Sequence, residues 1–138
     1  MSDLKLNSKK QKNFEDWFPI KSKINDRQNF PTFKVRDVFW CYIGENVGSE
    51  EDGKGQFYSR PVVIIKTFNS EFCLVVPLSS KIKENKYYVE FEFMGKPQSA
   101  LISQIKSIDV RRLKSKMGTV SHKDFDKIIN EIKQFWVN

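Results

Sequence analysis

Apolar and aromatic residues recur along the middle of the chain in five short runs, each typical of a β-strand. Some runs alternate apolar and polar positions, and others are continuously apolar. The runs are VRDVFWCYI (35–43), RPVVIIKTF (60–68), FCLVVPL (72–78), YYVEFEF (87–93) and SALISQI (99–105). Asn69-Ser70 and Gly95-Lys96-Pro97 indicate tight turns between neighbouring runs. Because turns rather than helices join these strands, we expect a mainly β protein, an antiparallel barrel or rolled sheet of about five to seven strands.

Two helices are predicted outside this strand-rich region. Asn13 or Asp16 can cap a helix in which Phe14, Trp17, Ile20 and Ile24 are helically spaced. Since Pro19 is best tolerated in a first turn, we expect a short helix that begins near Asp16.

In the tail, Ser121 and Asp124 form a variant of the capping box before an apolar face. That face consists of Phe125, Ile128, Ile129, Ile132, Phe135 and Trp136. We therefore expect an amphipathic C-terminal helix that packs on the barrel. The chain would divide into an N-terminal arm, residues 1–33, and one barrel domain, residues 34–138.

A long connection, residues 44–59, joins the first two runs. It holds four glycines and lacks apolar periodicity. Loops of this length in a compact domain are usually functional or disordered, so we expect a mobile loop. Its acidic Glu50, Glu51 and Asp52 are unexpected in a basic protein.

The net charge is +7, and the surplus is unevenly distributed. Residues 81–120 carry nine Lys and Arg against four Asp and Glu, and residues 1–33 carry seven against four. Such a surface attracts phosphate-rich partners, although lysine-rich proteins can be basic for solubility alone. The start has no signal-peptide pattern and no run is long enough to span a membrane, so we expect a cytoplasmic protein.

The inventory of reactive side chains excludes several kinds of site. His122 is the only histidine, which rules out a two-histidine acid–base pair, and we expect it to face solvent. Cys41 and Cys73 lie inside predicted strands, where a reduced, buried pair is expected, and one histidine with two separated cysteines does not supply the usual zinc ligands. An enzyme of this composition would work without a metal or other cofactor, through arginine, serine, glutamine and carboxylates.

Arg60 and Ser79 stand at strand ends that a hairpin brings together. Arg60 opens the second run and Ser79 follows the third, so antiparallel pairing places both at one end of the sheet. Cleavage of RNA by its own 2′-hydroxyl mainly requires groups that orient the phosphate and stabilise extra negative charge, as a guanidinium does. The same residues could instead be ordinary strand ends, with Arg60 paired to Glu50 or Glu51 on the rim. Spacing alone favours that structural interpretation.

From residue 35 to residue 136 the sequence resembles the MazF/PemK (Kid) family of toxin endoribonucleases from type II toxin–antitoxin systems. The resemblance rests on ordered blocks: RDVFWCYIG, GSEEDGKG, RPVVII, VVPLSS, SQIKSIDVRRL and KMGTVSHKDFDKIINEIKQF. It implies an SH3-like barrel that forms a homodimer and cleaves single-stranded RNA, such as mRNA, at short sequences without metal.

The resemblance also implies roles for individual residues. The family's catalytic arginine falls on Arg60, its catalytic threonine or serine on Ser79, and the glutamate of its loop on Glu50, as a base or a loop anchor. Gln104 matches the family's glutamine, although Ser103 stands where an aspartate is frequent. The residues expected to contact RNA are Ser80, Lys81, Lys83, Gln104 and Lys106.

The partner implied by the resemblance is a small antitoxin whose acidic tail occupies the RNA groove. Alternatively, the N-terminal arm could cover the groove or the barrel edge of its own chain. Two other functions fit the same fold: a catalytically silent SH3-like module that binds RNA or protein, and a gyrase-poisoning toxin, which would leave the Arg60–Ser79 pair without a role.

Overall fold

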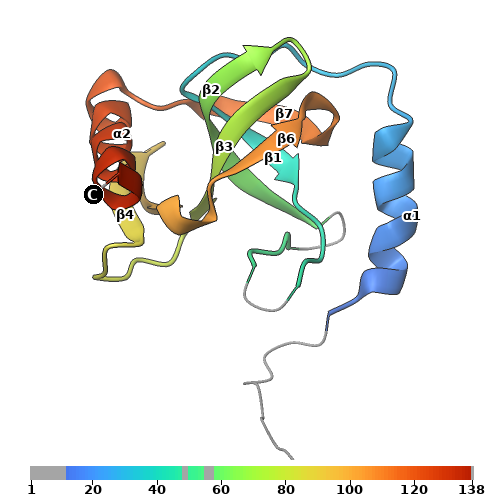
Figure 1. Ribbon diagram of the computed structural model, residues 1–138, viewed down its shortest axis with the longest axis horizontal. Helices are drawn as coiled ribbons and strands as arrows, with labels where there is room; N and C mark the ends of the chain where they lie inside the picture. The colour runs from blue at the N-terminus through green and yellow to red at the C-terminus, as the bar shows by residue number, and fades with distance from the viewer. Residues whose placement is uncertain (1–11, 48–49, 55–57, 138) are drawn as a thin grey trace, which may run out of the picture.

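Seven antiparallel strands form a rolled sheet between two α-helices (Figure 1). This computed structural model describes residues 12–47, 50–54 and 58–137. The strands are β1 (Asp37–Tyr42), β2 (Ser59–Asn69), β3 (Phe72–Ser79), β4 (Tyr88–Phe93), β5 (Lys96–Leu101), β6 (Lys106–Asp109) and β7 (Leu113–Thr119). Their order is β4-β5-β3-β2-β1-β7, and β6 also pairs with β3. The mainly β fold with a helix at each end is confirmed.

Two of the strands, β6 and β7, were not among the five predicted runs. Both are short and largely polar, and they follow the single 3-10 turns Ile102–Gln104 and Val110–Arg112. The first of these turns also ends β5 at Leu101, earlier than the predicted run. The sequence signal of β7 is weak because most of its side chains are exposed, whereas its backbone pairs with β1.

Tight turns join the consecutive hairpins. Between β2 and β3 the chain turns at Ser70 and Glu71, where the Asn69 side chain accepts a hydrogen bond from the Glu71 N–H at 2.8 Å. Between β4 and β5 it turns at Met94 and Gly95, with φ of 54° and 76°. Two consecutive positive φ angles match the twist of a two-residue hairpin. The turn therefore lies one residue earlier than Gly95-Lys96-Pro97 predicted, and Lys96 already belongs to β5.

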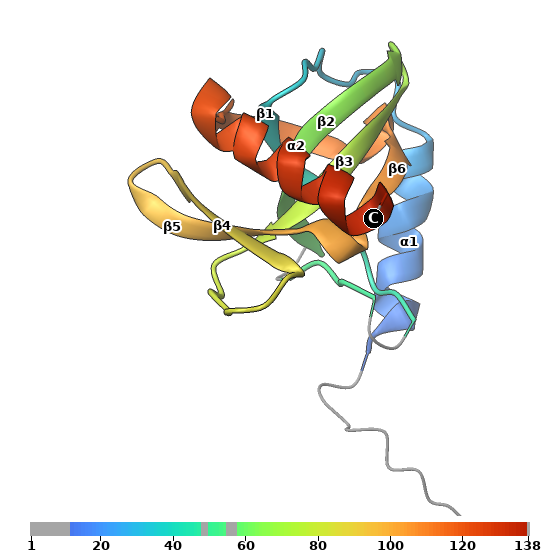
Figure 2. The same cartoon turned by 60° about the vertical axis from the view of Figure 1, so that its left-hand side comes forward.

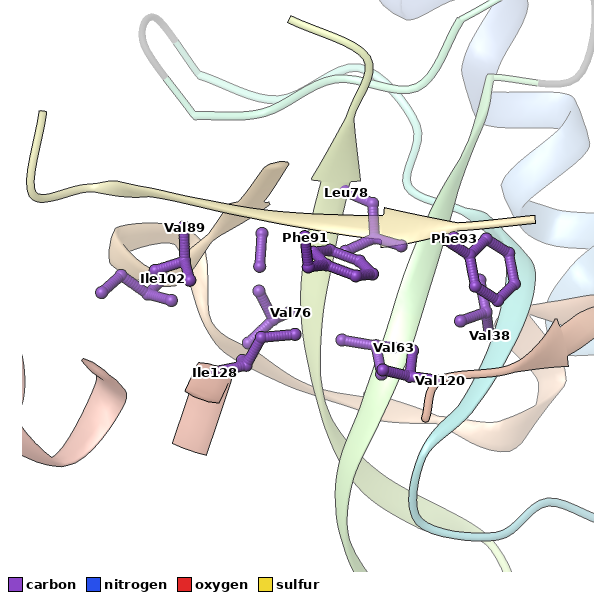
Figure 3. Packing of buried hydrophobic residues seen from close by; sticks show 11 residues of the cluster. Val38, Val63, Val76, Leu78, Val89, Phe91, Phe93, Ile102, Val120 and Ile128 are labelled. Carbon is purple, nitrogen blue, oxygen red and sulfur yellow. The ribbon is translucent and has the colours of Figure 1, made fainter. Parts of the chain in front are cut away.

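The central strands are buried on both faces, which explains their continuously apolar runs. Val63 and Val76 face a first core beneath β4, β5 and the C-terminal helix (Figure 3). Val62, Ile64 and Val75 face a second core closed by β6 and β7. Each fully buried aliphatic side chain contributes roughly 1.5–3 kcal/mol.

The C-terminal helix α2 (His122–Val137) agrees with the predicted element. The Ser121 hydroxyl caps it by accepting a hydrogen bond from the Asp124 N–H at 3.1 Å. Ile128 is fully buried in the first core, and the Trp136 indole N–H donates to the Ile102 carbonyl at 3.1 Å. Figure 2 shows α2 running across the sheet beside the β4–β5 hairpin. His122 is exposed, as expected.

The N-terminal helix α1 (Phe14–Asn25) begins earlier than predicted. Asn13 caps it by accepting a hydrogen bond from the Asp16 N–H at 3.1 Å, so Pro19 lies beyond the first turn. The prediction of a start near Asp16 was wrong because the proline removes only one N–H. Burial of Trp17 and Ile24, two turns apart on one face, stabilises the helix against that loss.

Neither helix of the described chain is long and apolar enough to cross a membrane. The prediction that no signal peptide is present concerns residues 1–11, and parts of the long loop, residues 48–49 and 55–57, also lie outside the described residues. The division of the chain at residues 33 and 34 stays a prediction.

Candidate active site

Arg60 and Ser79 lie opposite each other at one end of the β2–β3 hairpin. The register pairs Val62 with Pro77, and continuing it by two residues brings Arg60 to Ser79. Their relative exposures are only 8% and 7%. Both line one open groove of about 680 Å³. The neighbourhood expected from the hairpin is therefore present, and a buried arginine at a groove is unlike an ordinary rim residue.

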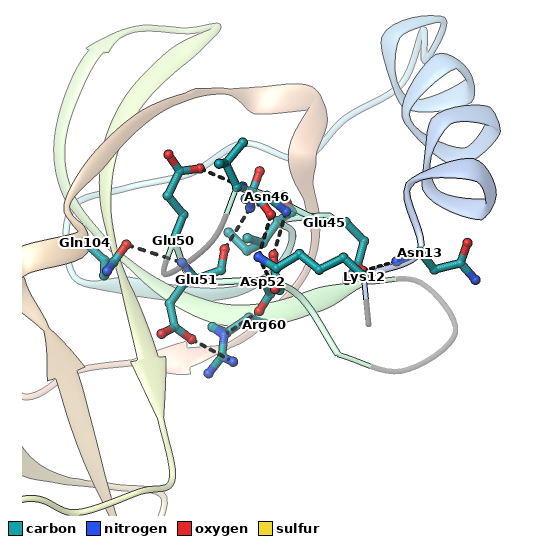
Figure 4. A network of polar contacts seen from close by, with 11 residues as sticks. Lys12, Asn13, Glu45, Asn46, Glu50, Glu51, Asp52, Arg60 and Gln104 are labelled. Carbon is teal, nitrogen blue, oxygen red and sulfur yellow. Dashed lines mark hydrogen bonds and ion pairs between the residues drawn. The ribbon is translucent and has the colours of Figure 1, made fainter. Parts of the chain in front are cut away.

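Three hydrogen-bonding contacts fix the Arg60 guanidinium (Figure 4). Nε donates to the Asp52 carbonyl at 3.0 Å, and Nη1 donates to the Leu78 carbonyl at 3.2 Å. Nη2 lies 2.8 Å from a carboxylate oxygen of Glu51. A guanidinium has five N–H donors, so these contacts use three and leave two for a ligand. The ion pair expected from the structural interpretation thus exists, and its partner is Glu51.

Ser79 presents its hydroxyl beside this arginine. Its oxygen accepts a hydrogen bond from the Lys81 N–H at 3.1 Å, which leaves the hydroxyl hydrogen available for donation. Ser80 lines the same groove and is exposed. Lys81 and Lys83 follow on the exposed connection to β4, where the Lys83 ammonium lies 5.2 Å from the centre of the Tyr88 ring.

The remaining predicted site residues, Glu50, Gln104 and Lys106, line a second hollow of about 290 Å³. The Glu50 carboxylate accepts a hydrogen bond from the Val47 N–H at 3.2 Å and does not approach Arg60. Burial lowers the pKa of Lys106, and the positive charge of Arg112 lowers it further. The structure therefore divides six of the eight predicted residues between two hollows, and Lys81 and Lys83 line neither.

Glu51 lies between the two hollows. Its backbone N–H faces the side-chain oxygen of Gln104 at 3.4 Å, and its carboxylate contacts Arg60. The sequence analysis considered Glu51 only as an alternative ion-pair partner of Arg60. The neighbouring residue, Asp52, binds Arg60 through its backbone carbonyl, and no pattern of side chains indicates such a contact.

The groove also contains residues that the sequence analysis did not single out. Trp40 is 38% exposed between two fully buried neighbours of β1, Phe39 and Cys41. An aromatic residue at an outward position of an alternating strand was the available signal. Further lining residues are Lys54, Ser59, Pro61, Phe93, Met94, Lys96, Gln98 and Met117.

The two cysteines are buried free thiols, as predicted. Burial raises the pKa of Cys41 to about 12 and that of Cys73 to about 11, so neither is a reactive thiolate at neutral pH. Among the described residues, His, Cys, Asp and Glu form no group of three that could hold a metal ion.

Comparison with solved structures relates this fold to toxins and toxin–antitoxin complexes. The structure of MazF from Deinococcus radiodurans matches with a TM-score of 0.65 and 15% identity, over 78% of this chain and 99% of that one. A chain of a MazE–MazF structure from the same organism matches with a TM-score of 0.59 and 14% identity, over 76% of this chain and 95% of that one. A mycobacterial endoribonuclease in complex with its cognate antitoxin matches at 0.53 and 13%, over 72% and 90%. At these identities the likeness establishes the fold. A comparison with curated protein sequences finds no match.

A family model assigns the chain by its sequence. The model, described as PemK-like, MazF-like toxin of type II toxin–antitoxin system, matches residues 34–136, which is most of the chain. The arm that carries α1 lies outside this match. The chain therefore belongs to the PemK/MazF family of toxins of type II toxin–antitoxin systems.

Proposed function

We propose that this protein is an endoribonuclease toxin that cleaves single-stranded RNA at specific short sequences without metal. The observation that carries the proposal is the buried, oriented guanidinium of Arg60 opposite the Ser79 hydroxyl in an open groove. Toxins of this family are endoribonucleases, which supports the same reaction class.

In the proposed reaction the 2′-oxygen bonds to the adjacent phosphorus and the bond from phosphorus to the 5′-oxygen breaks. The products are a 2′,3′-cyclic phosphate and a 5′-hydroxyl, whose proton comes from solvent. The pentacoordinate intermediate carries extra negative charge on its non-bridging oxygens. The two remaining N–H groups of Arg60 and the O–H of Ser79 would donate to these oxygens.

The 2′-hydroxyl must lose a proton, and two neighbouring glutamates are candidates to accept it. Glu51 lies 2.8 Å from the guanidinium, whereas Glu50 bonds to the loop backbone. We assign the base role to Glu51 and the loop-anchor role to Glu50. Glu51→Gln should lower kcat strongly, and the matched Glu50→Gln variant should lower it much less.

RNA bound across this site would follow the exposed basic residues. Lys81 and Lys83 lie on the connection that leaves the groove, and Lys54 and Lys96 line it. The second hollow, with Gln104 and Lys106, would hold a neighbouring nucleotide. Because these contacts are largely with phosphates, binding should weaken steeply with added salt.

The direct test is incubation of purified protein with a long single-stranded RNA in EDTA, followed by mapping of the cut ends. We expect cuts at a short recurring sequence with 2′,3′-cyclic phosphate ends. Arg60→Ala should lose about 10²–10³ in rate, and Ser79→Ala a comparable or smaller factor. A folded Arg60→Ala protein that cleaves like the wild type would contradict the role of Arg60. Wild-type protein that binds RNA without cutting it would favour a silent binding module.

Assembly and inhibition follow from the same proposal. We propose a C2 homodimer and an acidic antitoxin that competes with RNA for the groove, since related toxins are found in antitoxin complexes. Light scattering at micromolar concentration should report a dimer, and a monomer would refute the assembly. An acidic protein encoded beside this one should block cleavage, with an affinity that falls as salt rises.

A further inference from the structure

We propose that the described part of the N-terminal arm, residues 12–33, is a positioning element for the catalytic arginine. The arm contacts the described part of the loop after β1, residues 43–47 and 50–54, and this part of the loop holds the guanidinium of Arg60. The inference rests on the proposed function of Arg60. None of the described residues of the arm lines the 680 Å³ groove, so its contacts act on the loop and leave the groove open.

The apolar part of this attachment is a tryptophan packed on a glycine. Trp17 of α1 is only 5% exposed. Its indole lies so close to Gly44 that a Cβ there would come within 2.2 Å of the ring. The Trp17 ring also contacts Tyr58, with ring centres 5.5 Å apart, and the Tyr58 carbonyl accepts from the N–H groups of Ile43 and Gly44 at 3.0 Å. The tryptophan therefore packs where the two ends of the loop meet.

The polar part of the attachment connects the arm to the Arg60 guanidinium through a single residue, Asp52. The Lys12 ammonium lies 2.8 Å from the Asp52 carboxylate, and the Asp52 carbonyl accepts from Arg60 Nε at 3.0 Å. The same ammonium donates to the Asn46 carbonyl, and the Asn13 N–H donates to the Glu45 carboxylate (Figure 4). Asp52 thus binds the arm through its side chain and the catalytic arginine through its backbone.

The C-terminal end of α1 is also attached to the barrel, so the helix is held at both of its ends. Arg27 donates to the carbonyls of Arg111 and Leu113, the latter at 2.8 Å, and Ile24 is buried. Figure 1 shows α1 on the opposite side of the sheet from α2. Because α1 is bound to the barrel at one end and to the loop at the other, it restricts the movement of the loop.

The functional consequence concerns the orientation of Arg60 more than RNA affinity. A guanidinium with three fixed contacts presents its remaining donors in one direction, and small misplacement of a catalytic group lowers the rate strongly. Loss of the arm's contacts should therefore reduce kcat while the groove still binds RNA with a similar KM.

Lys12→Met tests this link, with Lys23→Met as the matched control. Lys23 is an exposed lysine at the other end of α1. Lys12→Met should lower kcat about tenfold or more, with KM changed by no more than about twofold. The Lys12→Arg variant should keep most of the wild-type kcat, because an arginine at this position can still pair with Asp52. Lys23→Met should behave like the wild type.

A second readout does not depend on nuclease activity. The Arg60 Nε–H is buried and hydrogen-bonded, so its ¹⁵N-resolved signal should exchange slowly with water in the wild type and in Lys23→Met. In Lys12→Met the exchange should quicken markedly. If RNA is not cleaved by any variant but this difference appears, the proposed nuclease function fails and the structural link stands.

A double-mutant cycle separates this route from a general loss of stability. In an Asp52→Asn background, Lys12→Met should have a smaller effect on kcat and on Arg60 exchange than in the wild type, because its pair with Asp52 is already weakened while its bond to the Asn46 carbonyl remains. Three results would each overturn the proposal. They are additive losses in the double mutant, a rise in KM without a fall in kcat, and unchanged Arg60 exchange in Lys12→Met.

Discussion

Gly44→Ala should undock the N-terminal helix, because the added methyl group would occupy the position of an indole ring. Gly44 has a φ of +86°, and a Cβ there would lie 2.2 Å, 2.3 Å and 2.6 Å from three ring atoms of Trp17. Contacts this short cannot be relieved by small adjustments. Either Trp17 leaves its site or the backbone at Gly44 moves.

The expected cost has two parts. A left-handed backbone conformation costs an alanine about 1–2 kcal/mol. Displacing a buried tryptophan costs up to about 3–5 kcal/mol, the typical loss for truncating it to alanine. The sum of about 4–7 kcal/mol is a large fraction of the stability of a small domain, and it should fall mainly on the docking of α1.

The structure supplies a matched control and a cycle. Gly95 has a φ of +76° but no atom within 4 Å of its added Cβ, so Gly95→Ala should cost only the backbone part. In a Trp17→Ala background, Gly44→Ala should likewise cost only about 1–2 kcal/mol. Urea unfolding would measure the free energies, and amide hydrogen exchange would report protection of α1. Full protection of α1 in Gly44→Ala, or equal costs of this substitution in both backgrounds, would refute the packing argument.

Four further predictions concern the site, the core and the C-terminal helix. Arg60→Lys keeps the charge but cannot make three forked contacts and still bind phosphate, so cleavage should fall about 10²–10³-fold, and a wild-type rate would count against the guanidinium geometry. Burial raises the pKa of Cys41 from 9.0 to about 12 and that of Cys73 to about 11, so both thiols should resist iodoacetamide at pH 8 until the protein unfolds. Since thiols of the unfolded chain ionise first, stability should fall by about 1.4 kcal/mol per pH unit for Cys41 as pH rises above 9.0, as measured by urea unfolding. Ser121→Ala removes the α2 cap and should cost about 1 kcal/mol in thermal unfolding, with no change in RNA cleavage.

The sequence was informative where a side-chain pattern reflects burial. The apolar runs predicted β1 to β5 because their inward residues fill two cores, and the spacing after Ser121 predicted α2. It was uninformative for β7, whose exposed side chains carry no apolar pattern although the backbone pairs with β1. Pro19 was misleading, because its local preference was outweighed by the burial of Trp17.

The candidate site shows the same division between short-range and long-range information. The antiparallel pairing of two strands joined by a tight turn was enough to predict that Arg60 lies beside Ser79, since the two residues belong to neighbouring strands. The position of Glu50 away from Arg60 depends on the path of an irregular loop, which no periodicity describes. The contact of Asp52 with Arg60 uses a backbone carbonyl, and its pairing with Lys12 joins segments far apart in the chain.

The position of β1 between β2 and β7 has a consequence for how the molecule is made. β1 pairs on one side with the next strand and on the other with residues Leu113–Thr119. Pairings between distant segments must overcome the entropy of closing long loops, so such folds usually form in milliseconds to seconds. The hydrogen bond from Arg27, which holds the arm on the barrel, also cannot form until Leu113 has been synthesised. During synthesis a ribosome would therefore release Arg60 and Ser79 well before β1 can pair with β7, and we expect the proposed cleavage of RNA only after residues Leu113–Thr119 have also left the ribosome.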